Sequence, residues 1–242
     1  VEDGFFGRSV ASAGDVDGDG FGDLIVGEHR HVVSSSIPPG PPTGGAAYLY
    51  HGSAAGVLSG GPGSAHTRIL STSTGFGRAV GAAGDVNADG YDDVIVGDPF
   101  AGGTGAAFVF HGSSLGLELT PAWTADGIQA FANLGLSVAG AGDVNGDGYG
   151  DVIVGAPSYD QGQTNEGKAL VYLGSPSGLG ADASWVAEGN QAGAYFGFSV
   201  SDAGDVNGDG FGDVVVGAPR HANGQAEEGR AYVHLGGAAG LG

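Results

Sequence analysis

The apolar residues of this chain fall into short runs and form no long amphipathic stripe. The runs are three to five residues long, rich in β-branched and aromatic types, and glycine stands on both sides of them. No window holds a sustained period of 3.6 residues, which an amphipathic helix requires. The pattern therefore predicts short β-strands and an all-β fold.

One block of sequence recurs four times and accounts for the whole chain. Each copy has a Phe-Gly or Leu-Gly pair, an acidic loop, and a Val- and Ile-rich run that ends in glycine. The first aspartates of the loops, Asp15, Asp85, Asp143 and Asp205, are 70, 58 and 62 residues apart. We expect one domain over residues 1–242, with repeats at about 5–70, 75–130, 133–191 and 195–242.

The third repeat shows the expected order of strands most clearly. Residues 136–140, 151–154, 168–173 and 184–187 each form a short apolar run, which predicts four antiparallel strands. Four-stranded sheets repeated in tandem are typical of a β-propeller, whose blades pack face to face. A Greek-key β-sandwich is the alternative, but a sandwich does not require one motif at a regular interval.

With four repeats, the sequence does not determine how the propeller closes into a ring. The last repeat stops after its third predicted strand, and only residues 1–4 precede the first. Four blades could close poorly, two chains could associate, or the chain could be a segment of a larger propeller of about seven blades. We favour the segment, because the exposed edge strands of a cut array need cover.

Each acidic loop reads Asp-x-(Asp/Asn)-x-Asp-Gly-(Phe/Tyr)-x-Asp. Oxygen donors two residues apart in a tight loop can converge on one point, and the glycine at the sixth position permits a positive φ. The seventh residue can add its backbone carbonyl. The candidate metal ligands are Asp15, Asp17, Asp19, Phe21 and Asp23; Asp85, Asn87, Asp89, Tyr91 and Asp93; Asp143, Asn145, Asp147, Tyr149 and Asp151; and Asp205, Asn207, Asp209, Phe211 and Asp213.

A set of about six oxygen donors suits Ca²⁺ well and Zn²⁺ poorly. The loops are not EF-hands, because no helices flank them and the twelfth position holds Val26, Val96, Val154 and Val216 in place of Glu. The ninth-position Asp must therefore complete the coordination shell of the ion. Solvated Asp/Asn/Gly turns are the alternative, but four copies in register favour about four calcium ions.

The charge of the chain supports a cation and limits the other partners. There are 27 acidic residues against 7 basic ones, a formal charge of −20, which four Ca²⁺ would reduce to −12. Such a charge argues against binding to nucleic acid or an anionic membrane surface. The chain has no cysteine, and no apolar run approaches the ~20 residues that span a bilayer, so we expect no direct membrane insertion.

Catalytic motifs are absent from the sequence, so we expect no enzyme. There is no Walker-type, His-Glu-x-x-His or Gly-x-Gly-x-x-Gly pattern. His51 and His111 share one repeat position, which indicates a structural or loop contact. The segment His29-Arg30-His31 could bind a metal or an anion, but a solvated loop is the favoured interpretation.

Two tryptophans, Trp123 and Trp185, also occupy equivalent positions, each near an acidic residue. Such a Trp could stack on a sugar and support a lectin. On the outermost strand of a blade, however, it more often covers a neighbouring blade, which we favour.

At these residues the chain resembles the FG-GAP repeat family, the calcium-bearing propeller blades of integrin α-subunit heads and of many bacterial and fungal secreted proteins. Phe6-Gly7, Phe76-Gly77 and Phe196-Gly197 match its first signature, and Leu134-Gly135 departs slightly. Residues 155–157 and 217–219 match the second signature, Gly-Ala-Pro; residues 97–99 match in part, and residues 27–29 lack the proline.

The resemblance implies a propeller with Ca²⁺ in the loop between the first and second strands of each blade. The loops between the second and third strands then lie on the opposite face, where their varied lengths favour binding. We expect a secreted or cell-surface module that recognises a protein or glycan ligand, with further blades of a parent chain or a second copy as additional partners. A non-catalytic accessory domain of a secreted hydrolase and a structural spacer are the alternatives.

Overall fold

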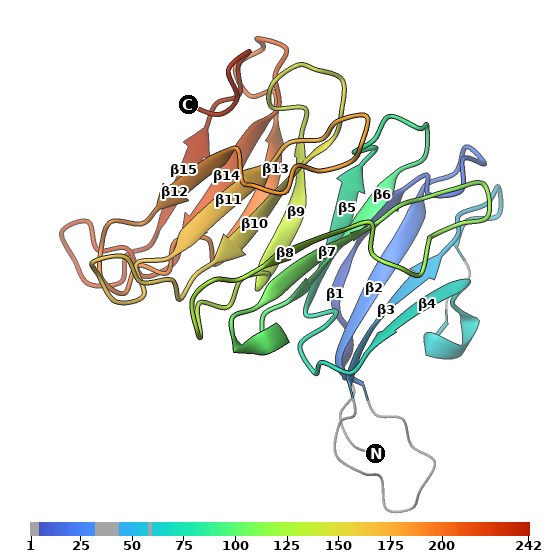
Figure 1. The fold of residues 1–242 in the computed structure, drawn as a ribbon, viewed down its shortest axis with the longest axis horizontal. Helices are drawn as coiled ribbons and strands as arrows, with labels where there is room; N and C mark the ends of the chain where they lie inside the picture. The colour runs from blue at the N-terminus through green and yellow to red at the C-terminus, as the bar shows by residue number, and fades with distance from the viewer. Residues whose placement is uncertain (1–4, 32–43, 58–59) are drawn as a thin grey trace, which may run out of the picture.

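Antiparallel sheets, arranged in chain order, make up the protein (Figure 1). The computed structural model describes residues 5–31, 44–57 and 60–242. The strands are β1 (Phe5–Gly14), β2 (Asp23–His31), β3 (Gly44–Tyr50), β4 (Thr67–Ser71), β5 (Ala79–Gly84), β6 (Asp93–Asp98), β7 (Ala106–Phe110), β8 (Trp123–Asp126), β9 (Ser137–Gly142), β10 (Asp151–Ala156), β11 (Lys168–Tyr172), β12 (Trp185–Glu188), β13 (Ser199–Gly204), β14 (Asp213–Ala218) and β15 (Arg230–His234).

The sheets are blade 1 (β1–β4), blade 2 (β5–β8), blade 3 (β9–β12) and blade 4 (β13–β15), and their strands pair in sequence order. Blade 4 has three strands, as the sequence predicts. The described residues add only two short 3-10 helices, η1 (Pro62–Ser64) and η2 (Ala101–Gly103), and no α-helix. The prediction of an all-β fold built from antiparallel propeller blades is confirmed.

The blades follow one another through their first strands. Strand β5 contacts both β1 and β9, and β9 contacts β13. Blade 1 and blade 4 consequently lie at opposite ends of the row, in blue and in orange to red (Figure 1). The sheets form an open row, and each inner blade packs one face against the preceding blade and the other against the following one.

The core consists of apolar layers between successive blades. Strands β6 and β10 are buried along their whole length, because alternate side chains of a strand point to opposite faces and both faces are covered. Val94 and Val96 pack in the layer shared with blade 1, whereas Ile95 packs in the layer shared with blade 3. A Val-Ile-Val run therefore fills two layers at once.

A glycine ends each of these runs because the next blade approaches it closely. A Cβ on Gly97 would lie 2.0 Å from the carbonyl oxygen of Gly135, and one on Gly155 would lie 2.0 Å from that of Gly197. Gly27 stands in the same relation to Gly77, at 2.1 Å. The Phe-Gly or Leu-Gly pair of one blade thus packs against the glycine that ends the second strand of the preceding blade. This contact explains why the pair and the terminal glycine recur together.

A bulge leads each first strand into its acidic loop. Strand pairing shifts register just before the loop, and the glycine there has a positive φ: 79° at Gly14, 74° at Gly84, 73° at Gly142 and 69° at Gly204. A side chain would strain that conformation. The bulge turns the chain out of the sheet, so that the acidic residues lie at the edge of the blade.

The close contact between blades 2 and 3 predicts a steep penalty at one glycine. Gly97→Ala should lower the free energy of unfolding by about 2–3 kcal/mol, because the added methyl group would collide with a backbone oxygen. Gly81→Ala, in the same sheet, is the matched control, since the nearest atom to its Cβ lies at 3.6 Å. Urea denaturation would measure both, and equal effects would contradict the proposed packing.

Candidate metal centre

The acidic loops connect β1 to β2, β5 to β6, β9 to β10 and β13 to β14, as the resemblance implies. In each, the first Asp accepts hydrogen bonds from the backbone N–H groups of the fifth and sixth residues. In the first loop, Asp19 N lies 3.0 Å from Asp15 Oδ1 and Gly20 N lies 2.9 Å from Asp15 Oδ2. The other loops repeat these bonds at 2.8–3.1 Å. The first Asp thus closes the turn and directs the next side chains toward its interior.

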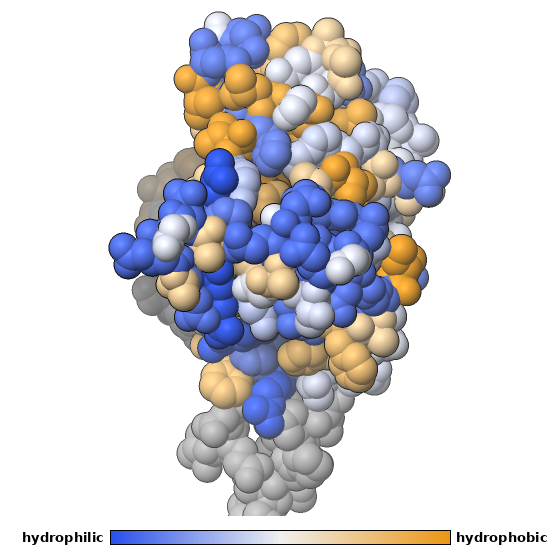
Figure 2. Space-filling model, turned by 90° about the vertical axis from the view of Figure 1, so that its left-hand side faces the viewer, coloured by the Kyte–Doolittle hydropathy of each residue, from blue (hydrophilic) through white to orange (hydrophobic). Residues whose placement is uncertain are grey.

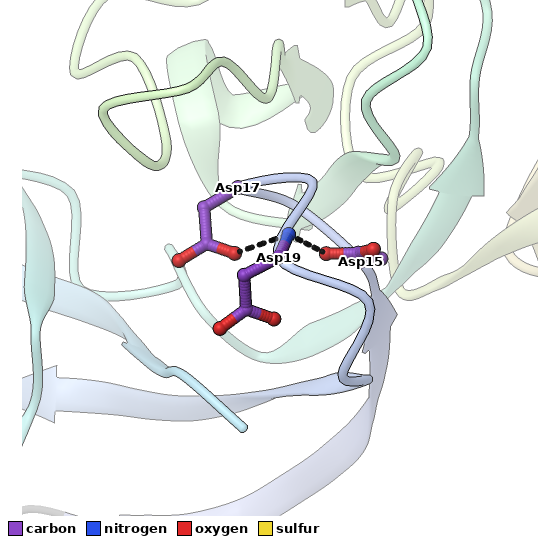
Figure 3. A group of neighbouring side chains, drawn as sticks. All are labelled: Asp15, Asp17 and Asp19. Atoms are coloured by element: carbon purple, nitrogen blue, oxygen red, sulfur yellow. Dashed lines mark hydrogen bonds between the residues drawn. The ribbon is translucent and has the colours of Figure 1, made fainter. Parts of the chain in front are cut away.

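Three carboxylates converge in the first loop. One oxygen from each of Asp15, Asp17 and Asp19 lies within 4.8 Å of the others (Figure 3). Carboxylates this close repel one another, and a bound cation removes that cost. The donors are all hard oxygens, which Ca²⁺ prefers, so the loop fits a calcium ion.

The other three loops have Asn in place of the middle aspartate. The side-chain amide nitrogens of Asn87, Asn145 and Asn207 donate to the fifth-position Asp at 2.9, 2.8 and 2.8 Å. Each amide oxygen accepts the backbone N–H of the fifth residue. The structure therefore brings the first, third and fifth residues together in all four loops, with one carboxylate fewer in three of them.

The ninth-position Asp has a structural role that the sequence analysis missed. Its two carboxylate oxygens each accept a backbone N–H. In blade 3, Asp151 Oδ2 lies 2.8 Å from Val144 N and Oδ1 lies 2.8 Å from Gly174 N. Asp23, Asp93 and Asp213 make the equivalent pairs of bonds at 2.7–3.0 Å. This residue clamps the acidic loop to the loop that follows the third strand of the same blade.

Burial separates the clamping aspartates from the exposed ones. Desolvation raises the pKa of Asp93 and of Asp151 to about 6, although the backbone N–H groups oppose the rise. In the exposed fourth loop, the hydrogen bond from Gly210 N–H, supported by those of its neighbours, lowers the pKa of Asp205. Asp205 is thus set to remain ionised, as a calcium ligand must.

The acidic loops also bind successive blades together. Asp15 O accepts the N–H of Asp92 at 3.1 Å, and Val16 O accepts the N–H of Ser113 at 3.0 Å. The same pair of bonds joins blade 2 to blade 3 and blade 3 to blade 4, with Asp85, Val86, Asp143 and Val144 as acceptors and Gly150, Ser175, Gly212 and Gly237 as donors. A cation that orders one loop therefore orders a junction between two blades.

The seventh-position aromatic residue packs across that junction. A Cβ on Gly18 would lie 2.8 Å from the Tyr91 ring, and one on Gly146 would lie 2.7 Å from the Phe211 ring. The ring of one loop thus covers the fourth residue of the preceding loop. The recurrence of an aromatic residue at the seventh position was the available sequence signal.

The paired histidines and tryptophans make the contacts that the sequence analysis favours. His51 Nδ1 lies 2.7 Å from Asp17 Oδ2, and His111 Nδ1 lies 3.4 Å from Asn87 Nδ2, so both contact an acidic loop as predicted. Trp123 donates from Nε1 to Gly180 O at 2.8 Å, and Trp185 packs edge-on against His234. Both tryptophans cover the next blade, as favoured.

The interpretation of residues 29–31 as a solvated loop is wrong. His29 and Arg30 belong to β2, and His29 is buried with its ring stacked on Phe5 at 4.7 Å between centroids. Burial, aided by nearby arginines, lowers the pKa of His29 to about 4. The side chain of His31 lies outside the described residues.

Comparison with known families settles what the repeats are. The sequence profile of the FG-GAP repeat matches residues 6–50, 76–110, 134–172 and 196–234. The chain belongs to the FG-GAP repeat family. Each matched range of this FG-GAP protein begins at a Phe-Gly or Leu-Gly pair, and each runs through the acidic loop into the third strand of the blade.

Curated relatives of the FG-GAP chain are integrin α subunits. It is 30% identical over 237 residues to integrin alpha-5 of Xenopus laevis, which covers 90% of this chain and 20% of that protein. It is 33% identical to integrin alpha pat-2 of Caenorhabditis elegans, covering 90% of this chain and 18% of that protein. The chain spans about a fifth of the length of these relatives.

Solved structures share the fold at low identity. A Bacillus licheniformis rhamnogalacturonan lyase aligns with a TM-score of 0.52 at 18% identity, over 84% of this chain and 38% of the lyase. The rhamnogalacturonan lyase YesW aligns with a TM-score of 0.51 at 17% identity, over 85% and 40%. Within the described residues, no helix has the length and apolar character to cross a membrane.

Substitution of a ninth-position Asp, which clamps two loops, and of a fifth-position Asp, which faces the candidate ion, should change the stability of the protein in different ways. Asp151→Asn should lower the free energy of unfolding by about 1–3 kcal/mol even without calcium, because its NH₂ group faces a buried N–H donor. Asp147→Asn, at an exposed position, should leave the stability without calcium unchanged and weaken only the stabilisation by calcium. Thermal denaturation with and without a chelator would measure both, and equal losses for both variants in chelator would contradict the distinction.

Proposed function

We propose that this FG-GAP protein is a calcium-stabilised, extracellular or cell-surface binding module without catalytic activity. It recognises a protein or carbohydrate ligand through the loops opposite its calcium sites. The relation to integrin α subunits over 90% of the chain supports an adhesion-type role outside the cell. The four oxygen-rich loops at the blade junctions are the observation that carries the proposal.

Calcium acts as a structural element in this proposal. In each loop the ligands are the first, third, fifth and ninth side chains with the seventh backbone carbonyl, giving about four ions. The carboxylate cluster at Asp15, Asp17 and Asp19 supports the first site most directly. Loops of this kind have weak affinities in extracellular modules, which saturate at millimolar calcium.

The loops opposite the calcium sites are braced from the neighbouring blade. Gln129, which follows β8, donates from Nε2 to Asp160 O at 2.8 Å and accepts Asp160 N–H at Oε1 at 2.7 Å. Gln191, which follows β12, does the same with Ala222, at 3.0 and 2.5 Å. Loops held in this way lose little conformational freedom on binding, which favours recognition.

A cavity between blades 2 and 3 lies beside one braced loop. It has a volume of about 210 Å³, and its lining includes Asp126, Gln129, Tyr159, Lys168 and Asp182. The Lys168 ammonium lies 4.0 Å from the centroid of the Tyr159 ring. An aromatic ring beside charged hydrogen-bonding groups suits a sugar ring or a polar peptide side chain, so we assign the ligand to this region.

Calcium should raise the stability of the protein in proportion to the number of intact loops. With a Kd of ~10⁻⁴ M, ~1 mM free Ca²⁺ would add roughly 1.4 kcal/mol per site. Calorimetric titration of the chelator-treated protein should give about four ions, and replacing both Asp15 and Asp19 with Ala should remove one of them. A melting temperature indifferent to chelator would refute the calcium sites.

Ligand binding should depend on the braced loops and not on the calcium face. We expect the protein to bind members of a panel of purified matrix proteins and immobilised glycans. Tyr159→Ala should weaken that binding about ten-fold or more, as loss of a central aromatic contact does. Leu115→Ala, at an exposed position in the loop after β7, is the control and should bind normally.

The outcome that would contradict this role is binding unaffected by Tyr159→Ala but lost with Leu115→Ala. Turnover of polysaccharide by the purified chain would overturn the absence of catalysis.

A further inference from the structure

One position in each repeat places a side chain near the start of the first strand. The position follows the Phe-Gly or Leu-Gly pair, and it holds Arg8, Arg78, Leu136 and Phe198 in blades 1 to 4. Each first strand runs from this position toward its acidic loop, so the four residues lie at the end of the blades away from the candidate calcium sites. Together with Ser9 they line a cavity of about 330 Å³. Equivalent residues of four blades therefore meet at one place.

The cavity lies where the first strands of the blades run side by side. Strand β5 contacts β1 and β9, and β9 contacts β13. A second cavity, of about 490 Å³, follows the same strands toward the acidic loops, and Gly, Ala and Val line most of it, among them Gly81, Ala139 and Val200. Its acidic lining residue, Asp202, is near the loop end of β13, so the part of this lining beside the arginines is uncharged.

Arg8 and Arg78 bring two positive charges together in a strongly acidic protein. The chain has 27 acidic residues against 7 basic ones, so a basic side chain has many possible partners. Lys168, for example, forms an ion pair with Glu188 at 3.2 Å. Within the described residues, neither Arg8 nor Arg78 forms such a pair. Both side chains are therefore available to an anion from another molecule.

The two arginines are close enough to repel each other. Burial, together with the charge of Arg8, lowers the pKa of Arg78, although an arginine stays protonated throughout the physiological range. The same two arginines, with Arg30, add to the burial that lowers the pKa of His29 to about 4, so this neighbour stays neutral. A bound anion would reduce the repulsion between the two guanidinium groups, as a cation does in the acidic loops.

The strands hold the two arginines in a fixed place. Val80 N–H donates to Ser9 Oγ at 3.0 Å, which joins blade 2 to blade 1 beside Arg8. Arg78 N–H donates to Gly75 O at 3.0 Å and closes the turn before β5. Because the backbone that carries both guanidinium groups is already ordered, a ligand bound there costs less conformational entropy.

The other half of the cavity is apolar. Leu136 is partly buried, and Phe198 is 51% exposed. Figure 2, which views the blade-4 side, shows small groups of apolar side chains among polar ones. A ligand that carries an anionic group next to an apolar one fits this combination. A carboxylate suits the arginines, because a guanidinium group can bind it through two parallel N–H···O bonds.

We propose that Arg8 and Arg78 bind the carboxylate of an acidic side chain in a protein ligand, and that Leu136 and Phe198 receive an apolar side chain beside it. A chain of formal charge −20 repels a long polyanion, such as a sulfated glycan, more strongly than a single carboxylate. A peptide segment also supplies a charged and an apolar side chain next to each other. The site is separate from the cavity beside Tyr159, so it does not depend on the ligand region proposed above.

Titration with short peptides tests the site. The probes are the capped peptide Gly-Leu-Asp-Phe-Gly and the same peptide with Asn in place of Asp, added to ¹⁵N-labelled protein in ~1 mM Ca²⁺. The Asp peptide should shift the side-chain Nε–H signals of Arg8 and Arg78 in the NMR spectrum. It should also bind at least about ten-fold more tightly than the Asn peptide, because only the carboxylate makes charge-assisted hydrogen bonds to both arginines.

Substitution of the arginines tests their roles one at a time. Arg8→Gln and Arg78→Gln should each weaken binding of the Asp peptide about ten-fold or more and leave binding of the Asn peptide unchanged. Arg68→Gln, which removes an exposed positive charge from β4, is the control and should bind the Asp peptide as the parent does. Arg8 is exposed, so Arg8→Gln should keep the backbone amide spectrum of the parent.

Four outcomes would overturn the proposal. Two are equal binding of the two peptides and binding of the Asp peptide that is unchanged in both arginine variants. A third is a set of shifts confined to the signals around Tyr159, which would place the peptide in the other cavity. The fourth is a heparin hexasaccharide that shifts the signals of Arg8 and Arg78 when the Asp peptide does not. None of these outcomes would contradict the calcium sites or the loop-mediated binding proposed above.

Discussion

The fold depends on the close backbone contact between successive sheets. A carbonyl oxygen from the Phe-Gly segment of one blade occupies the space where a side chain would begin on the preceding blade, at Gly27, Gly97 and Gly155. This contact fixes the distance and the angle between sheets, because neither backbone can yield without losing strand pairing. The apolar layers around Ile25, Ile95 and Ile153 then fill a gap whose width is already set.

The acidic loops complete these junctions at the edge of the blades. The loops of blades 1, 2 and 3 are each held by three kinds of bond: the turn closed by the first Asp, the clamp made by the ninth Asp, and the carbonyls that reach the next blade. Only the carboxylates gathered inside the turn are left with strong mutual repulsion. Calcium is therefore suited to reduce the repulsion between these carboxylates. Because the loops lie where two sheets meet, a bound ion stabilises both sheets.

Much of this arrangement could be predicted from the sequence, because it depends on side-chain type and spacing. The Val-Ile-Val runs predict the buried second strands, and the regular Asp and Asn positions predict the loops. The junction hydrogen bonds could not be predicted in this way, since main-chain atoms such as Asp15 O and Val16 O have no residue-type signature. His29 was misplaced because its polar neighbours suggested a loop, whereas β2 extends through it and the Phe5 ring covers it.

The bracing of the loops by Gln129 and Gln191 has a consequence for how this surface can diversify. Both glutamines bond to main-chain atoms of the facing residue, Asp160 or Ala222, and not to its side chain. Mutations at position 222 can therefore alter shape and charge while the loop retains its anchor, whereas the Asp160 carboxylate also accepts Asn165 N–H at 2.6 Å and is less free to change. Related chains could therefore acquire new ligands through substitutions in these loops that leave the packing of the blades unchanged.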